Sequence, residues 1–417
     1  MRTKAVYTSQ SHFEHRPVTR IHWLLLPPTT PPVTVRHDFH KQKRRFMSTQ
    51  HHRCRRCLLP AGKFDVRLDP SGLCNRCRSW DEEEASYASF EQHRPVLEQR
   101  LSQVRGRFHY DAAVGMSGGK DSAYVAHRMT STYGANVLGI TFDNGFLTDY
   151  AWRNIQEITR VTGMDHLVYR PDWEAMREFY KATLRRLGDP CFACSIGGYV
   201  LSIRGCHDLR IPYFVHGRSP MQMFRNLYPG SRDPGLGILR ANLREYNADA
   251  LRVQYSKLIR RVKLLLLASA RSRAVRRRIN QELFGAGLAG EAVVPEFLAF
   301  FLFEPYEEEA IKRHLEEGNS GYRRPERDAV LGHGDCLIHD VSAHLYELKH
   351  GVNRVLPDLA ALLRQGRITA DEAPAILASN TPSEEDIEIS TRHLLERLDM
   401  TRDEFEAIKR RLTAKGK

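Results

Sequence analysis

No hydrophobic run in this sequence approaches the roughly 20 apolar residues that a transmembrane helix needs, and the four leucines at 264–267 fall far short. Acidic residues are outnumbered by basic ones: 50 Asp and Glu stand against 63 Lys and Arg, which gives a formal net charge of +13. The basic excess is concentrated in residues 1–56 and 240–280, and the remainder is mildly acidic. The overall charge is therefore weak evidence for nucleic-acid binding.

Cysteine is sparse, with 8 in 417 residues, and six of the eight stand in close pairs. This pattern argues against the disulfide framework of a small secreted protein and favours metal binding or catalysis. We expect a cytoplasmic protein without membrane insertion. A chain of this length can bury a substantial core in one large domain or two ordinary ones.

Residues 1–46 differ from the rest of the chain. The proline-rich stretch Pro27–Pro32 cannot form a helix, and the three leucines at 24–26 are too few for the apolar core of a signal peptide. Met47 lies shortly before the first cysteine pair. We therefore expect 1–46 to be a disordered or mis-called extension, followed by a cysteine module over 47–80.

Two Cys-x-x-Cys pairs define that module. They consist of Cys54, Cys57, Cys74 and Cys77. Each turn presents two thiolates to one side, and two such turns complete a tetrahedral Zn²⁺ site. Four protein ligands leave the metal no open position, so we predict a structural zinc ribbon.

The most informative stretch follows an apolar run at 112–114 and leads into a helical pattern. It reads Ser117-Gly118-Gly119-Lys120-Asp121-Ser122. A strand, a glycine-rich turn and a helix aim backbone N–H groups and a helix N-terminus at one point, which suits a phosphate. The stretch is not a Walker A loop, because Asp121 follows Lys120 where that loop has Ser or Thr.

This motif resembles the SGG-x-DS signature of the PP-loop ATP pyrophosphatases, the superfamily of GMP synthetase, asparagine synthetase and the tRNA thiolation enzymes. The resemblance implies that all six residues bind ATP and that a substrate oxygen attacks its α-phosphorus. Nitrogen or sulfur then displaces AMP. Lys120 and Asp121 would be catalytic, with Asp121 helping to hold Mg²⁺. Asp143, which opens Asp-Asn-Gly, resembles the segment that contacts adenosine, although a plain turn is the alternative.

From residue 109 onward, strand and helix patterns alternate. The predicted strands are 110–115, 136–143, 166–169 and 211–216, and the predicted helices are 122–133, 148–162 and 173–187. Alternation of this kind predicts an α/β fold with a doubly wound parallel sheet, HUP-like under the resemblance. We assign 81–239 to an ATP-binding domain, 240–290 to a basic helical insertion, and 291–417 to the rest of the catalytic region with a helical C-terminal cap.

Three further features leave alternatives open. Cys191 and Cys194 open a helix, where a thiol pKa is usually lowered; they could bind a metal or an iron–sulfur cluster, carry a persulfide, or only shape the site. His333, Asp335, Cys336 and His339 could bind a metal or a polar substrate, or be structural. The basic segment 240–280 is either a solvated helix packed by its leucines or a docking face for an acidic partner or anionic substrate.

From about Cys54 to the C-terminus, the order of these features is similar to that of the N-acetyl sugar amidotransferases. The resemblance implies a small N-acetyl sugar substrate whose acetamido oxygen is activated by ATP and displaced by ammonia. A glutaminase and a synthase subunit would supply the ammonia. Where that family tends to have an acidic residue before Asn-Pro, this chain has Arg218-Ser-Pro, which suggests a more anionic substrate. We assign Arg218, His333, Asp335 and His339 to substrate binding.

Two rival hypotheses remain. In the first, a sulfurtransferase uses Cys191, Cys194 and Cys336 as catalytic residues, with an iron–sulfur cluster or a persulfide, to thiolate a tRNA or a metabolite. Nucleic acid is a partner only under this alternative. In the second, the chain is a non-catalytic nucleotide-binding module, against which the intact motif argues.

Overall fold

The computed structural model describes residues 53–87, 90–219, 259–267, 273–285, 295–325 and 334–416. The predicted extension 1–46, much of the basic insertion and His333 lie outside these residues. None of the helices in the described ranges could cross a bilayer.

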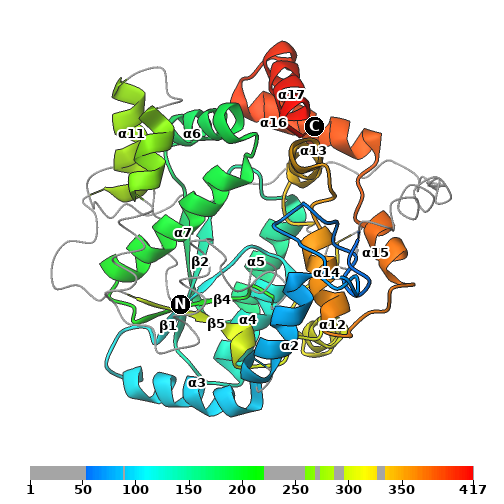
Figure 1. Ribbon diagram of the computed structural model, residues 1–417. Helices are drawn as coiled ribbons and strands as arrows, with labels where there is room; N and C mark the ends of the chain where they lie inside the picture. Colours follow the sequence, from blue (N-terminus) through cyan, green and yellow to red (C-terminus); the bar gives the residue numbers. More distant parts are fainter. Residues whose placement is uncertain are drawn as a thin grey trace, which may run out of the picture.

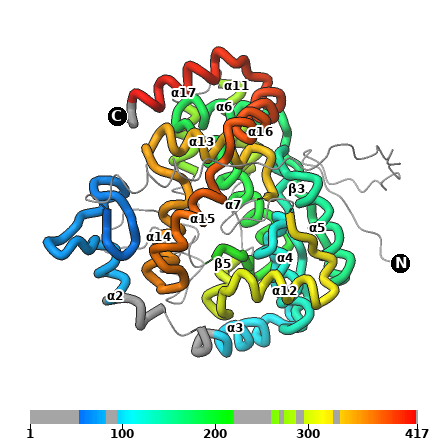
Figure 2. The backbone as a smooth tube through the Cα atoms, turned by 90° about the vertical axis from the view of Figure 1, so that its right-hand side faces the viewer, coloured from blue at the N-terminus to red at the C-terminus, as the bar shows by residue number. Residues whose placement is uncertain are grey.

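Five parallel strands form the central sheet, in the order β3-β2-β1-β4-β5. Figure 1 labels β1, β2, β4 and β5, and Figure 2 labels β3. The strands are β1 (Ala112–Gly115), β2 (Val137–Phe142), β3 (Asp165–Tyr169), β4 (Tyr213–His216) and β5 (Glu296–Ala299). The chain builds outward from β1 to one edge and then returns through β4 to build the other. The predicted doubly wound parallel sheet is confirmed, and the strand order reverses between β1 and β4.

The sheet is buried on both faces because its strands are almost continuously apolar, as in other parallel sheets. Alternate residues of β1 show the two faces: Ala113 belongs to one hydrophobic core, and Ala112 and Val114 to the other. The first core contains α6 (Trp173–Leu187) and α7 (Cys191–Asp208). The second contains α3 (Phe90–Val104), α4 (Lys120–Ser131), α5 (Asp149–Thr162) and α12 (Glu308–Glu317).

The apolar stretch that starts at residue 295 forms β5 and a short 3-10 helix, η2 (Phe300–Leu302). Of the basic insertion, α11 (Arg273–Phe284) packs on α6 and α7. Its Ile279 and Leu283 are fully buried, and Arg278 forms ion pairs with Asp172 and Glu174. This described part of the insertion is a packed helix.

The C-terminal region is helical, as predicted. It consists of α13 (His339–His350), α14 (Leu356–Arg364), α15 (Ala373–Ser379), α16 (Glu384–Leu398) and α17 (Arg402–Gly416). The cysteine module, which continues into α2 (Asn75–Tyr87), lies beside α14 in both views (Figures 1 and 2). Its four cysteines share a hydrophobic core with Leu359 and Leu363 of α14.

Candidate functional site

The glycine-rich loop lies between β1 and α4, next to the point where the strand order reverses. Ligands of doubly wound sheets bind in this crevice. Gly118 has φ +81°, and a Cβ added there would stand 2.3 Å from the carbonyl oxygen of Ala151. Asn154 Nδ2 donates to the Gly118 carbonyl at 3.0 Å. The loop is therefore pressed against α5 in a conformation that favours glycine.

Two serine hydroxyls hold this loop in shape. Ser122 Oγ donates to the Gly119 carbonyl at 2.9 Å and accepts from the Ser117 N–H at 3.2 Å. The Gly119 N–H donates to Ser117 Oγ at 3.3 Å. The six residues of the motif thus form one compact turn at the start of α4, whose N-terminus suits a phosphate group.

Lys120 is held by carboxylates from two elements. Its Nζ lies 3.7 Å from Asp121 Oδ1 and 3.7 Å from Glu308 Oε1 of α12. Burial alone would lower the pKa of Lys120, but Asp121 and Glu308 raise it above its usual value. Glu308 also pairs with Lys312, which is 2% exposed. Sequence reasoning missed Glu308 and Lys312, because no motif or spacing links this helix to the loop.

Asp121 has the properties expected of a ligand to a hard cation. Its Oδ1 is buried and accepts no hydrogen bond, with the Lys120 ammonium 3.7 Å away, and burial raises the pKa of the carboxyl. Mg²⁺ prefers carboxylate oxygens together with substrate phosphates, and a cation here would offset the cost of burying the charge. The residues present therefore fit Mg²⁺ bound with ATP.

Asp335 and Cys336 reach the loop through strand-like pairing. Leu147 and Cys336 form an antiparallel bridge, and the Thr148 N–H donates to the Asp335 carbonyl at 3.2 Å. Asp335 Oδ2 would lie 3.6 Å from a Cβ at Gly119, and burial raises the pKa of its carboxyl. Cys336 lies before the start of α13 and is not part of a helix.

Cys194 and Cys336 are thiols with raised pKa values. Burial raises the pKa of Cys194 to about 11, with Cys191 adding to it, and Asn144 Nδ2 donates to its Sγ at 3.2 Å. Burial and the neighbouring Cys194 and Cys191 raise the pKa of Cys336 well above its usual range. The expected lowering at the helix N-terminus is wrong for Cys194, because burial outweighs the helix. The three cysteines influence one another, yet their sulfurs are not all within 4.8 Å.

Cys191 differs from the other two because polar groups of the C-terminal region contact it. Its Sγ lies 2.9 Å from Ser342 Oγ, and Arg354 Nη1 donates to it at 3.5 Å. Arg354 Nη1 also donates to Ser342 Oγ at 2.7 Å. Sequence reasoning missed both residues, which are brought to Cys191 only by the packing of α13 on the sheet domain.

Asp143 shapes the turn that follows β2. One carboxylate oxygen accepts from the Gly145 N–H at 3.1 Å, and the other accepts from Arg170 Nε at 2.9 Å. A Cβ at Gly145 would lie 2.4 Å from Trp173. These contacts agree with the plain-turn alternative, and contact with ATP stays a prediction.

The substrate residues chosen from the sequence are dispersed. Arg218 follows β4, is exposed, and its N–H donates to His216 Nδ1 at 3.4 Å. His339 opens α13, with its Nδ1 3.2 Å from Asp340 Oδ1. His333 lies outside the described residues. The structure thus brings Asp335 to the loop, and substrate binding by Arg218 and His339 stays a prediction.

His216 should make the fold sensitive to acid. Burial, helped by Arg218, lowers the pKa of His216 to about 3, against about 6.5 for a free imidazole. Between these values the unfolded chain binds a proton that the folded chain does not, so stability is full above pH 6.5 and falls as the pH drops. Between pH 7 and pH 5 the loss should be about 2 kcal/mol. Urea unfolding of the wild type and H216Q checks this, because H216Q should lack that part of the loss.

Among the described residues, one group of potential metal ligands has all of its ligand atoms within 4.8 Å of one another, and it is the four-cysteine cluster. All four cysteines are fully buried. The Sγ atoms of Cys54 and Cys77 are 3.7 Å apart, and those of Cys57 and Cys74 are 3.6 Å apart. Four sulfurs at about 2.3 Å from a central Zn²⁺ would be about 3.8 Å apart. The geometry fits a closed, structural zinc site.

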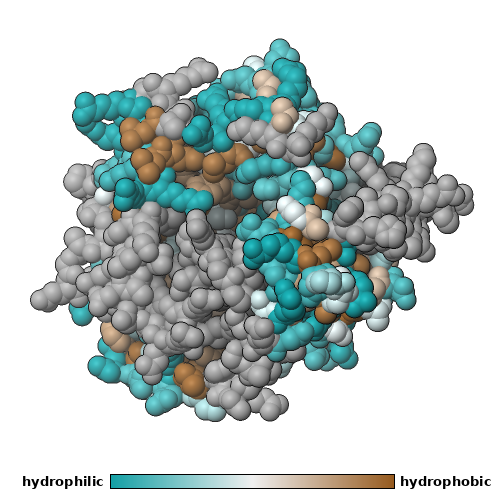
Figure 3. Space-filling view, in the orientation of Figure 1, coloured by the Kyte–Doolittle hydropathy of each residue, from teal (hydrophilic) through white to brown (hydrophobic). Residues whose placement is uncertain are grey.

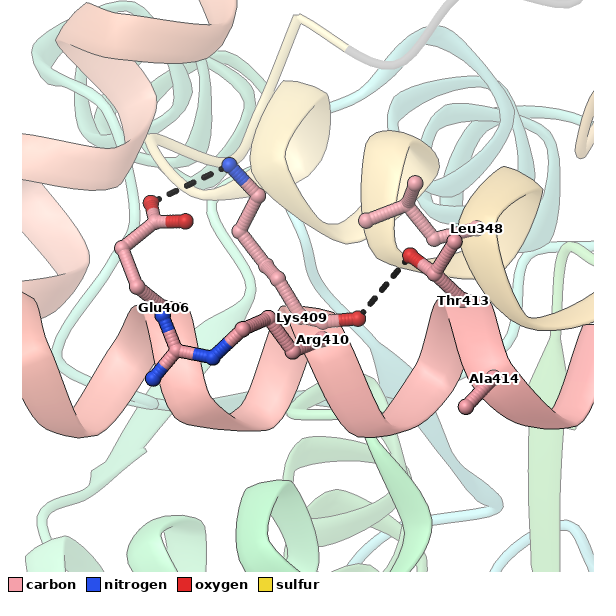
Figure 4. Close-up of a pocket in the computed structure, with 6 residues that line it drawn as sticks. All are labelled: Leu348, Glu406, Lys409, Arg410, Thr413 and Ala414. Atoms are coloured by element: carbon pink, nitrogen blue, oxygen red, sulfur yellow. Dashed lines mark hydrogen bonds and ion pairs between the residues drawn. The ribbon is translucent and has the colours of Figure 1, made fainter.

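A separate surface pocket lies between α13 and α17 (Figure 4). It is lined by Leu348, Glu406, Lys409, Arg410, Thr413 and Ala414. Lys409 pairs with Glu406 at 3.1 Å. None of the candidate site residues lines this pocket, so we do not assign the chemistry to it.

Comparisons with known proteins show that the C-terminal region is similar to one family. Residues 333–416 match the family described as LPS biosynthesis protein WbpG-like, C-terminal domain. No curated protein sequence matches the chain. Among solved structures, the U34-tRNA thiolase NcsA from Methanococcus maripaludis with its 4Fe-4S cluster is similar at 13% identity and a TM-score of 0.32. The match covers 76% of this chain and 86% of that one, but a score this low supports no argument about fold or function.

Proposed function

We propose that this chain is an ATP-dependent amidotransferase that acts on an N-acetyl sugar. The observation that carries the proposal is the glycine-rich loop at the strand-order reversal, with Lys120, the buried Asp121 and Asp335 beside it. The similarity of residues 333–416 to an LPS biosynthesis family supports a surface-polysaccharide sugar as the acceptor.

The proposed reaction has two displacement steps. The acetamido oxygen attacks the α-phosphorus of ATP, and pyrophosphate leaves. Ammonia then attacks the imidate carbon, AMP leaves with the former amide oxygen, and loss of a proton gives an acetamidino group. A glutaminase partner, acting through a synthase subunit, would supply the ammonia.

The chain's own residues would act mainly through position and charge. The backbone N–H groups of Gly118 and Gly119 and the Lys120 ammonium bind the phosphates. Mg²⁺ on Asp121 would supply positive charge as pyrophosphate departs. Asp335 lies between the loop and the cysteines, where it can orient the acceptor.

Sulfur transfer is the second candidate, and the position of Cys194 and Cys336 beside Asp335 favours it. The metal content of anaerobically purified protein separates the two. Amide-nitrogen transfer predicts about one zinc and no iron or acid-labile sulfide. Iron and sulfide that are lost in C194A would contradict the amidotransferase proposal and support sulfur transfer.

A further inference from the structure

The helix at 259–267 has an unusual outward face. Leu264 and Leu267 are 58% and 63% exposed, the highest values among the large hydrophobic side chains in the described ranges. They are three residues apart and therefore share one face of the helix. The opposite face is anchored, because Val262 and Leu266 are fully buried in the core that contains α6 and α7.

Positive charge surrounds the two leucines. Arg260 and Lys263 are exposed one turn before Leu264 and Leu267, respectively, and the described residues 259–267 include no acidic side chain. In the next described segment of the chain, Arg273 and Arg277 of α11 are also exposed. Figure 3 shows apolar and hydrophilic surface side by side over the region of α11 and α6.

This helix also touches the cysteine site. The guanidinium of Arg261 lies 5.1 Å from the centre of the Phe192 ring, between Cys191 and Cys194 in the sequence. A surface that docks through Leu264 and Leu267 would therefore lie near one edge of the candidate site.

We propose that the outward face of helix 259–267, with Arg273 and Arg277 of α11, binds the surface of an anionic lipid bilayer. Exposed leucines flanked by Lys and Arg combine apolar insertion into the interface with attraction to anionic headgroups. The positive charge of this face is complementary to an anionic membrane surface, whereas an uncharged bilayer would be bound by the two leucines alone. This binding is peripheral and adds to the proposed activity without depending on it.

Flotation of the full chain with lipid vesicles tests the proposal. The wild type should float with vesicles of phosphatidylcholine and phosphatidylglycerol, but not with phosphatidylcholine alone. Raising NaCl from about 0.1 M to about 0.5 M should release it. L264Q/L267Q should bind at least about tenfold more weakly. R260Q/K263Q should also bind more weakly and should respond less to salt.

I389Q is the matched control, because Ile389 is an exposed apolar residue of α16 at 42% exposure. It should float like the wild type, and thermal unfolding of all variants checks that they are folded. The proposal is overturned if the wild type does not float with anionic vesicles, or if L264Q/L267Q floats equally well. Capture of an acidic protein without vesicle binding would also overturn it, by assigning the face to a protein partner.

Discussion

Replacing Gly118 with alanine should weaken the binding of a non-hydrolysable Mg-ATP analogue at least about 100-fold. The new Cβ would stand 2.3 Å from the carbonyl oxygen and 2.6 Å from the Cα of Ala151. Alanine at φ +81° is also strained by about 1–2 kcal/mol. Either α5 or the loop must move, and the N–H groups that we propose to bind the phosphates then lose their alignment. Isothermal titration calorimetry of the wild type and G118A measures the difference.

Gly119→Ala is the matched control in the neighbouring position. Gly119 has φ −77° and ψ 162°, which any residue adopts. A Cβ there would lie 3.4 Å from Ser117 Oγ and 3.6 Å from Asp335 Oδ2, which are ordinary contacts. G119A should therefore lose less than about tenfold in affinity. If G118A binds the analogue as tightly as the wild type, or if G119A is equally impaired, the steric explanation is wrong.

Replacing Cys57 with alanine should remove the zinc and destabilise the interface with α14. Zinc binding to such a site is itself folding free energy, so we expect a loss of more than about 3 kcal/mol from the module. The loss should reach the C-terminal region, because Arg56 Nη2 donates to the Arg364 carbonyl at 2.7 Å. Zinc analysis and hydrogen exchange of residues 356–364 measure both effects.

Cys206→Ala is the control that separates the effect of losing the metal from the effect of truncating a buried cysteine. Cys206 is as fully buried as Cys57, but it lies in α7 within the sheet domain. C206A should keep the zinc and the slow exchange of α14, at a cost of about 1 kcal/mol. Retention of zinc in C57A, or the same loss in both variants, would contradict a structural zinc site.

The elements that the sequence predicted well are those whose signals are local. The glycine-rich motif needs a strand before it and a helix after it, and β1 and α4 occupy those positions. The cysteine spacing predicted the four-cysteine cluster, because two Cys-x-x-Cys turns have few other ways to be buried. The parallel sheet followed from the alternation of strand and helix patterns, whereas the order of its strands came from the structure alone.

The features that the sequence did not reveal depend on long-range packing. Glu308 reaches Lys120 only because α12 packs on α4. In the sequence, the glutamates of α12 look like the acidic residues found in the first turn of many helices. Arg354 and Ser342 reach Cys191 only because α13 joins the sheet domain. The thiol of Cys194 was misjudged for the same reason: the helix N-terminus is visible in the sequence, whereas the burial that raises its pKa is not.

Two parts of the C-terminal region contact the candidate site. The segment before α13 brings Asp335 to the loop, and the turn after it brings Arg354 to Cys191. The same region carries α14, on which the cysteine module rests. We infer that the region matched to the LPS biosynthesis family completes the site and is not a separate appendage.

In the proposed reaction, an amide oxygen attacks the α-phosphorus of ATP. The most direct test incubates the full chain with ATP, ammonia and N-acetyl sugars labelled with ¹⁸O in the acetamido group, and then analyses the nucleotides by mass spectrometry. We expect ammonia-dependent AMP that carries one ¹⁸O atom, together with unlabelled pyrophosphate. Formation of ADP and phosphate, or of AMP without ¹⁸O, would contradict it.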